Sequence, residues 1–75
     1  MKRICVIGLG YIGLPTACLF ANAGYGVVGV EINQEKIEKL NHGKLPFEEK
    51  GLEELFEKAL PNMSFKTKPE EADVF

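Results

Sequence analysis

Residues 4–13 of this 75-residue chain read ICVIGLGYIG, an apolar run followed by glycines at positions 8, 10 and 13. In a G-x-G-x-x-G between a strand and a helix, the first glycine allows a tight turn and the second lets the backbone approach a pyrophosphate. The third permits close packing of the helix on the strand. The pattern therefore predicts a dinucleotide-binding turn built on Gly8, Gly10 and Gly13.

The segments on either side of the turn have the periodicities that this prediction requires. Residues 3–7 form a short apolar run, typical of a strand buried on both faces of a parallel sheet. Residues 11–23 follow a helical pattern, in which Pro15 falls in the first turn, where no intrahelical hydrogen bond is lost. Gly24 supplies a left-handed end to this helix. The helix should lie close on the sheet, because every fourth residue is small: Gly13, Ala17 and Ala21.

A second strand is predicted over residues 26–31, and it ends in the acid Glu31. An acid at this place in a dinucleotide-binding unit accepts hydrogen bonds from a ribose. Asn33 then caps a helix over residues 34–40, whose apolar face carries Ile37 and Leu40. The sequence thus supplies the fourth feature of the dinucleotide site.

The rest of the chain predicts further elements of an α/β fold. An amphipathic helix follows the loop 44–50, with Leu52, Leu55, Phe56, Ala59 and Leu60 on its apolar face. A short strand over residues 63–66, one helical turn over residues 69–72 and a strand beginning at residue 73 come next. The fold class is a Rossmann-type parallel sheet with flanking helices, truncated after the start of the fourth strand. Residues 1–75 then form a partial N-terminal domain, with the remaining domains outside this chain.

Composition and charge exclude several classes of function. The chain is 45% hydrophobic and carries a net charge of −2, which offers no basic surface to nucleic acid or to an anionic membrane. Cys5 and Cys18 have neither C-x-x-C spacing nor a neighbouring histidine, so we expect buried thiols and no metal site. His42 follows a predicted helix end, where a solvated side chain interacts weakly with the helix dipole. We expect neither a nucleic-acid nor a membrane partner.

The first 23 residues also have the outline of a signal peptide. Basic residues precede an apolar stretch, and residues 21–23 read Ala-Asn-Ala, as at a cleavage site. Cleavage there would discard all three glycines of the turn, whereas the dinucleotide interpretation uses them and also explains Glu31. We therefore expect a cytoplasmic protein.

Five segments together resemble the beginning of the nucleotide-sugar 6-dehydrogenases, the UDP-glucose/GDP-mannose dehydrogenase family. They are GLGYIGLPTA at residues 8–17, GVEIN at 29–33, NHGKLPFEE at 41–49, GLEEL at 51–55 and EADVF at 71–75. The form of residues 12–17 is more similar to the branch that oxidises UDP-N-acetylmannosamine or UDP-N-acetylglucosamine than to the UDP-glucose branch. Two positions depart from the family pattern: Glu31 stands where aspartate is usual, and Lys50 where proline is usual.

The resemblance implies an NAD-dependent, homo-oligomeric enzyme that oxidises the C6 alcohol of a UDP-sugar to the uronate in two steps. Its catalytic cysteine would lie beyond residue 75, so no catalytic residue is expected here. Only contacts to NAD carry over: the glycines in the turn, the backbone of the next two residues at the pyrophosphate, an acid at the adenosine ribose and a lysine near it. In this sequence they are Gly8, Gly10, Gly13, Tyr11, Ile12, Glu31 and Lys36.

Two other interpretations of the glycine motif stay open at this point. A non-enzymatic nucleotide-sensing Rossmann module would share the turn and the acid, and an FAD-binding domain would suit Glu31 together with Ala17. The segment 41–55 distinguishes the dehydrogenase from the sensor module, because sensor modules normally lack this long loop and extra helix.

The doubly wound strand order places strand one between strands two and four. A chain that stops at residue 75 should therefore leave an edge of strand one unpaired, which favours association with a second copy. We expect this chain alone to be marginally stable, to dimerise and to bind NAD weakly.

Overall fold

The computed structural model describes residues 2–68 and 73–74. Four parallel strands form one sheet in the order β3-β2-β1-β4. Their bounds are Arg3–Ile7 for β1, Gly26–Val30 for β2, Met63–Lys66 for β3 and Asp73–Val74 for β4. The predicted α/β fold with a parallel sheet is confirmed.

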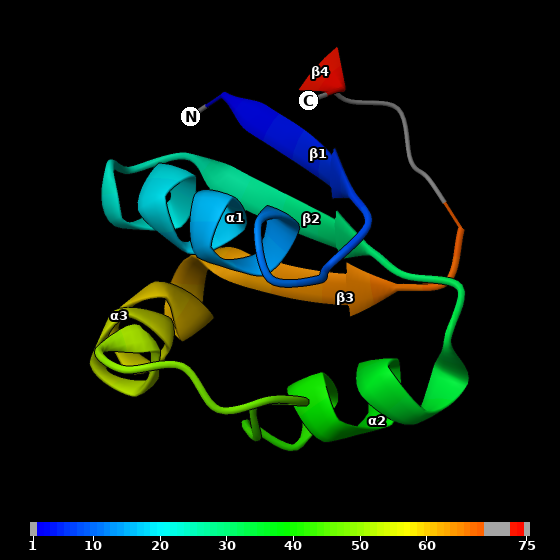
Figure 1. Cartoon of the computed structure of the whole chain (residues 1–75). Coiled ribbons are helices and arrows are strands. Elements are labelled where there is room, and N and C mark those ends of the chain that lie inside the picture. The colour runs from blue at the N-terminus through cyan, green and yellow to red at the C-terminus, as the bar shows by residue number, and fades with distance from the viewer. Residues whose placement is uncertain (1, 69–72, 75) are drawn as a thin grey trace.

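Within the described residues, β1 is joined to β2 by α1 (Gly13–Asn22). β2 is joined to β3 by α2 (Gln34–Asn41), α3 (Leu52–Ala59) and the 3₁₀ helix η1 (Leu60–Asn62). Figure 1 shows α1 lying against the sheet, with α3 beside α1 and α2 near β3. The crossovers from β1 to β2 and from β2 to β3 run in the same direction, so right-handed connections keep these helices on one face of the sheet.

The main core lies between the sheet and these helices. Ile4, Val6 and Val27 of the sheet are buried there with helical residues such as Leu14 and Phe56. The predicted small-residue face of α1 is confirmed, because Ala17 and Ala21 are both fully buried. Alternate residues of β1 and β2 belong to a second buried cluster on the other side of the sheet: Cys5, Val28 and Val30.

Side-chain amides connect the helices that cover the sheet. Asn22 at the end of α1 donates from Nδ2 to the Leu55 carbonyl at 3.1 Å. Asn62 in η1 donates from Nδ2 to the Ala21 carbonyl at 3.0 Å. The far end of α1 is thus fixed to α3 and η1, which leaves its first turn at the opposite end, over the carboxyl ends of the strands.

Two expectations require correction. The helix predicted over residues 11–23 begins two residues later, because residues 8–12 form the turn and the last of them, Ile12, is the N-cap. The edge of β1 is also not wholly unpaired: Ile4 pairs with Asp73 and Cys5 with Val74 in the parallel register. The helical turn predicted over residues 69–72 lies outside the described residues.

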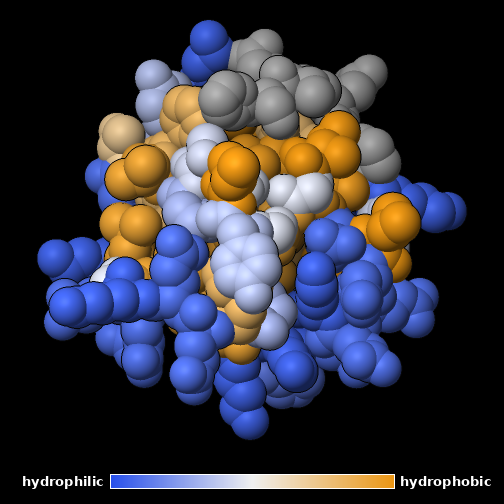
Figure 2. All heavy atoms as spheres, in the orientation of Figure 1, coloured by the Kyte–Doolittle hydropathy of each residue, from blue (hydrophilic) through white to orange (hydrophobic). Residues whose placement is uncertain are grey.

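Charged and apolar side chains are unevenly distributed over the surface. Figure 2 shows hydrophilic residues over the lower part of the molecule, where Figure 1 places α2, α3 and their connecting loop, and hydrophobic residues toward β1 and α1. The described part of the chain contains no helix that is both long and apolar enough to cross a membrane.

Candidate functional site

The turn between β1 and α1 is fixed by backbone contacts. Gly8 has a φ of +87°, a conformation that side chains rarely adopt, and its amide donates to the Val30 carbonyl at 2.8 Å. A Cβ built on Gly13 would overlap the carbonyl oxygen of Gly8. The first glycine therefore makes the bend, and the third allows the helix to start directly against it.

The open side of this turn has the features of an anion site. An ideal Cβ at Gly10 would meet no heavy atom within 4 Å, so the backbone is accessible there. Leu14 is the first residue of α1 to donate in the i to i−4 pattern, to the Gly10 carbonyl at 3.1 Å. The amides of residues 11–13 precede it at the positive end of the helix, where phosphate groups bind.

Glu31, directly after β2, places a carboxylate beside the turn. Its Oε1 accepts from the Leu9 amide and its Oε2 from the Asn33 amide, each at 3.1 Å. The Asn33 amide, followed by the Leu9 amide and the charge of Lys36, holds the pKa of Glu31 below its usual value, against the opposing effect of burial. The carboxylate is therefore ionised at neutral pH. Residues Ile7 and Val30 are register partners, which brings the turn and the acid together.

The start of α2 supports the acid from the other side. Asn33 is its N-cap, as predicted, and Oδ1 accepts from the amides of Glu35 at 3.0 Å and Lys36 at 3.3 Å. The same residue therefore caps α2 with its side chain and binds Glu31 with its amide. Lys36, in the first turn of α2, lies close enough to Glu31 for its charge to lower the pKa of this acid.

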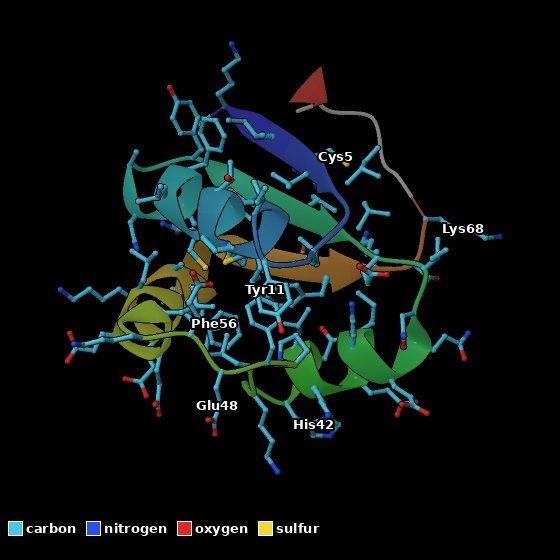
Figure 3. All side chains as sticks on the ribbon, in the orientation of Figure 1. Cys5, Tyr11, His42, Glu48, Phe56 and Lys68 are labelled. Atoms are coloured by element: carbon cyan, nitrogen blue, oxygen red, sulfur yellow. The ribbon has the colours of Figure 1, made fainter. Side chains whose placement is uncertain are left out.

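An aromatic pair connects the turn to the loop between α2 and α3. The rings of Tyr11 and Phe47 lie 4.4 Å apart between centroids, with an interplanar angle of 40°. Figure 3 shows Tyr11 pointing from the start of α1 toward this loop. Tyr11 is 70% exposed and Ile12 is 83% exposed, so both side chains point outward while their backbone lies at the helix start. Ile32, after the acid, is also exposed, and apolar surface beside polar groups is typical of a ligand site.

All seven predicted cofactor residues lie in this one region: in the turn, directly after β2 or in the first turn of α2. Sequence reasoning missed Leu9 and Gly29. Leu9 is fully buried, and its amide is the partner of Glu31. Gly29 lies inside β2, where a glycine often marks a close approach of other atoms, so a signal for it was present.

Other groups in the described residues do not form a comparable site. Burial raises the pKa of the Cys18 thiol to about 11, and Cys5 is also fully buried. His42 lies at the end of α2 with Nδ1 2.7 Å from the Glu38 carbonyl, consistent with the predicted interaction with the helix end. No group of three metal-binding side chains is present in residues 2–68 and 73–74. A cavity of about 630 Å³ between the loop and α3 contains none of the predicted cofactor residues.

Comparison with known proteins gives one consistent family. The model of the NAD-binding domain of the UDP-glucose/GDP-mannose dehydrogenase family matches residues 2–75. A UDP-N-acetyl-D-mannosamine dehydrogenase of Methanococcus maripaludis is 51% identical over the whole chain, and one of Campylobacter jejuni is 48% identical over 99% of it. The chain spans 18% and 19% of the lengths of these two relatives.

Solved structures agree with the sequence relatives. The UDP-N-acetyl-mannosamine dehydrogenase Cap5O of Staphylococcus aureus superposes with a TM-score of 0.93 at 47% identity, covering 99% of this chain and 18% of that one. A GDP-mannose dehydrogenase of Pseudomonas aeruginosa superposes with a TM-score of 0.78 at 34% identity, covering 91% of this chain and 16% of that one. The turn, the acid after β2 and the match over nearly every residue lead to one conclusion: this chain belongs to the UDP-glucose/GDP-mannose dehydrogenase family and carries residues of its NAD-binding domain.

Proposed function

We propose that this chain binds NAD with the turn at residues 8–13 and the carboxylate of Glu31. The observation that supports this assignment most directly is the ionised Glu31, hydrogen bonded to the Leu9 amide inside the glycine turn. One carboxylate is therefore hydrogen bonded to the turn two residues before the amides of residues 11–13, which begin the anion-binding helix start. The pyrophosphate and the adenosine ribose of a dinucleotide need these two groups side by side.

Each proposed cofactor residue has a specific role. Gly8 and Gly13 shape the turn, and Gly10 leaves space for the pyrophosphate, whose oxygens accept from amides at Tyr11, Ile12 and Gly13. Glu31 accepts from ribose hydroxyls through lone pairs that its two backbone bonds do not use. After the Asn33 and Leu9 amides, the positive charge of Lys36 also helps to lower the pKa of Glu31, and it adds a cation near the ribose. Because a carboxylate repels a 2′-phosphate, the site favours NAD over NADP.

The activity of the longer protein is a second part of the proposal. NAD would supply the acceptor for a hydride released when the C6 alcohol of a UDP-sugar is oxidised. The names of the relatives favour a UDP-N-acetylhexosamine, since the first seven sequence matches are called UDP-N-acetyl-D-mannosamine dehydrogenase. We further propose a cytoplasmic homo-oligomer in which residues 1–75 are part of the N-terminal domain and catalytic residues come from other segments.

The proposal is tested by calorimetric titration of the chain with NAD, NADP and FAD. NAD should bind, with NADP weaker and FAD undetected. Gly10→Val should abolish NAD binding, because the new side chain fills the open side of the turn, where a Cβ would meet no heavy atom within 4 Å. Ala23→Val adds the same side chain at the exposed far end of α1 and should leave the affinity unchanged. Equal NAD affinity in the Gly10→Val variant and the wild type would refute the assigned site.

A further inference from the structure

Leu9 lies between the first two glycines of the turn, and it is the one residue of the turn whose side chain is fully buried. Tyr11 and Ile12, in the same turn, are largely exposed. The buried Leu9 side chain therefore anchors to the core a turn whose other residues are glycines or have exposed side chains. The connection from β1 to α1 passes the carboxyl end of β2 in Figure 1. The δ carbons of Leu9 lie over Gly29 of this strand.

Gly29 provides the space for this side chain. A Cβ at Gly29 would lie 2.8 Å from Leu9 Cδ1 and 3.1 Å from Cδ2, closer than side-chain carbons normally approach. The next contact, with Phe65 Cδ1, would be 3.3 Å. A glycine in a strand interior lowers strand stability, and here it admits the Leu9 side chain into the core.

Glu31 binds the other end of the same residue. Its Oε1 accepts from the Leu9 amide at 3.1 Å, while the neighbouring Gly8 amide donates to the Val30 carbonyl at 2.8 Å. Three successive residues of β2 and its end, Gly29, Val30 and Glu31, therefore contact two successive residues of the turn. These contacts fix the turn before any ligand is present.

We infer that Leu9 is the positioning residue of the phosphate-binding turn. Its side chain packs into the space over Gly29, and its amide donates to Glu31. This inference rests on the proposed NAD site. Gly29 is not one of the proposed NAD-binding residues, and a Cβ there would meet Leu9 first. A substitution at Gly29 should therefore change NAD affinity through Leu9. Small displacements of a binding group are sufficient to weaken the ligand strongly.

The experiment uses Gly29→Ala, Leu9→Val and the double variant, with NAD affinity measured by calorimetry well below each melting temperature. Gly29→Ala should weaken NAD about tenfold, as for one misaligned hydrogen bond to a charged ligand. Leu9→Val removes both δ carbons that the new methyl would meet, so the double variant should return to within about threefold of the wild type. Phe56→Leu, a core change in α3, is the control for lost stability and should not alter the affinity.

Amide hydrogen exchange separates positioning from general destabilisation. In Gly29→Ala, exchange should rise at the Leu9 amide while the amides of Cys5 and Ala17 stay protected, and the double variant should restore protection at Leu9. Unchanged NAD affinity in Gly29→Ala would overturn the inference, and so would a double variant no better than Gly29→Ala. If the wild type did not bind NAD, the proposed function would be overturned instead. Hydrogen exchange at the Leu9 amide would still decide whether Gly29 positions this residue.

Discussion

The turn at residues 8–13 and the loop at residues 44–50 lie next to each other but are held in different ways. The turn is fixed by hydrogen bonds from its own backbone: the Gly8 amide donates to the Val30 carbonyl, and the Leu9 amide donates to the Glu31 carboxylate. The loop is tied at its ends, by the Lys44 amide to the Lys39 carbonyl and the Leu52 amide to the Glu49 carbonyl, and in its middle by the Phe47 ring. A segment that binds ligand with its amides needs a fixed backbone, whereas a segment that shapes a surface can depend on side chains. Substitutions in the turn should therefore be far more damaging than substitutions in the loop.

The largest effect is expected for Gly13→Ala. Its Cβ would overlap the Gly8 carbonyl, so either the turn or the start of α1 must move, at a cost of about 3 kcal/mol or more. Urea denaturation followed by circular dichroism measures this loss. Gly10→Ala is the matched control in the same turn, because its Cβ meets nothing within 4 Å. Equal stability of the two variants would show that the turn is not fixed in the way described.

The next largest effect is a loss of NAD affinity in Glu31→Ala. Losing a charge-assisted hydrogen bond to the ribose should weaken NAD by about 1.5 to 3 kcal/mol in calorimetric titration. Glu31→Asp keeps the charge but shortens the reach to the Leu9 amide, so it should fall between the wild type and Glu31→Ala. If Glu31→Ala binds NAD as tightly as the wild type, the acid does not contact the ribose.

A smaller effect is expected for Phe47→Leu in the loop. Leucine keeps most of the apolar contact but removes the ring pair with Tyr11, which is worth about 0.5 to 1.5 kcal/mol. Thermal melts should show a modest decrease in melting temperature, and Phe47→Tyr should be close to the wild type. A loss as large as that of Gly13→Ala would contradict the contrast between the two segments.

The smallest effect is the pH dependence contributed by Glu31. Folding lowers the pKa of this carboxyl, so its stabilisation is present above the unfolded pKa and is lost as the pH falls through the folded pKa. The side chain is partly exposed, so solvent screening keeps the contribution small. The difference in melting temperature between the wild type and Glu31→Gln should shrink from about pH 7 to about pH 3. A constant difference over that range would exclude the acid as its source.

Much of this fold could be predicted from the sequence, because local patterns and tertiary contacts agree. The bounds of β1, the cap at Asn33 and the apolar face of α3 depend on periodicity and on short-range chemistry. The start of α1 was placed two residues early because residues 11 and 12 have helical composition, while the turn that includes them is set by contacts with β2.

The site could be located from sequence but its internal connections could not. The spacing of the glycines and the acid identified which residues gather at the carboxyl ends of β1 and β2. The bond from Glu31 to the Leu9 amide and the space over Gly29 depend on how two strands are aligned in register. The position of β4 beside β1 follows from the doubly wound strand order, but the residue pairs that join them, Ile4 with Asp73 and Cys5 with Val74, were not expected.

The burial of both thiols has a practical consequence for experiments on this chain. Alkylating reagents attack the thiolate, and a thiol with a pKa of about 11 in the core, such as Cys18, is almost entirely protonated at neutral pH. A cysteine introduced at the exposed Ser64 on β3 should therefore take up a maleimide fluorophore while Cys5 and Cys18 remain unmodified. One dye per molecule can then be attached without first replacing a native residue.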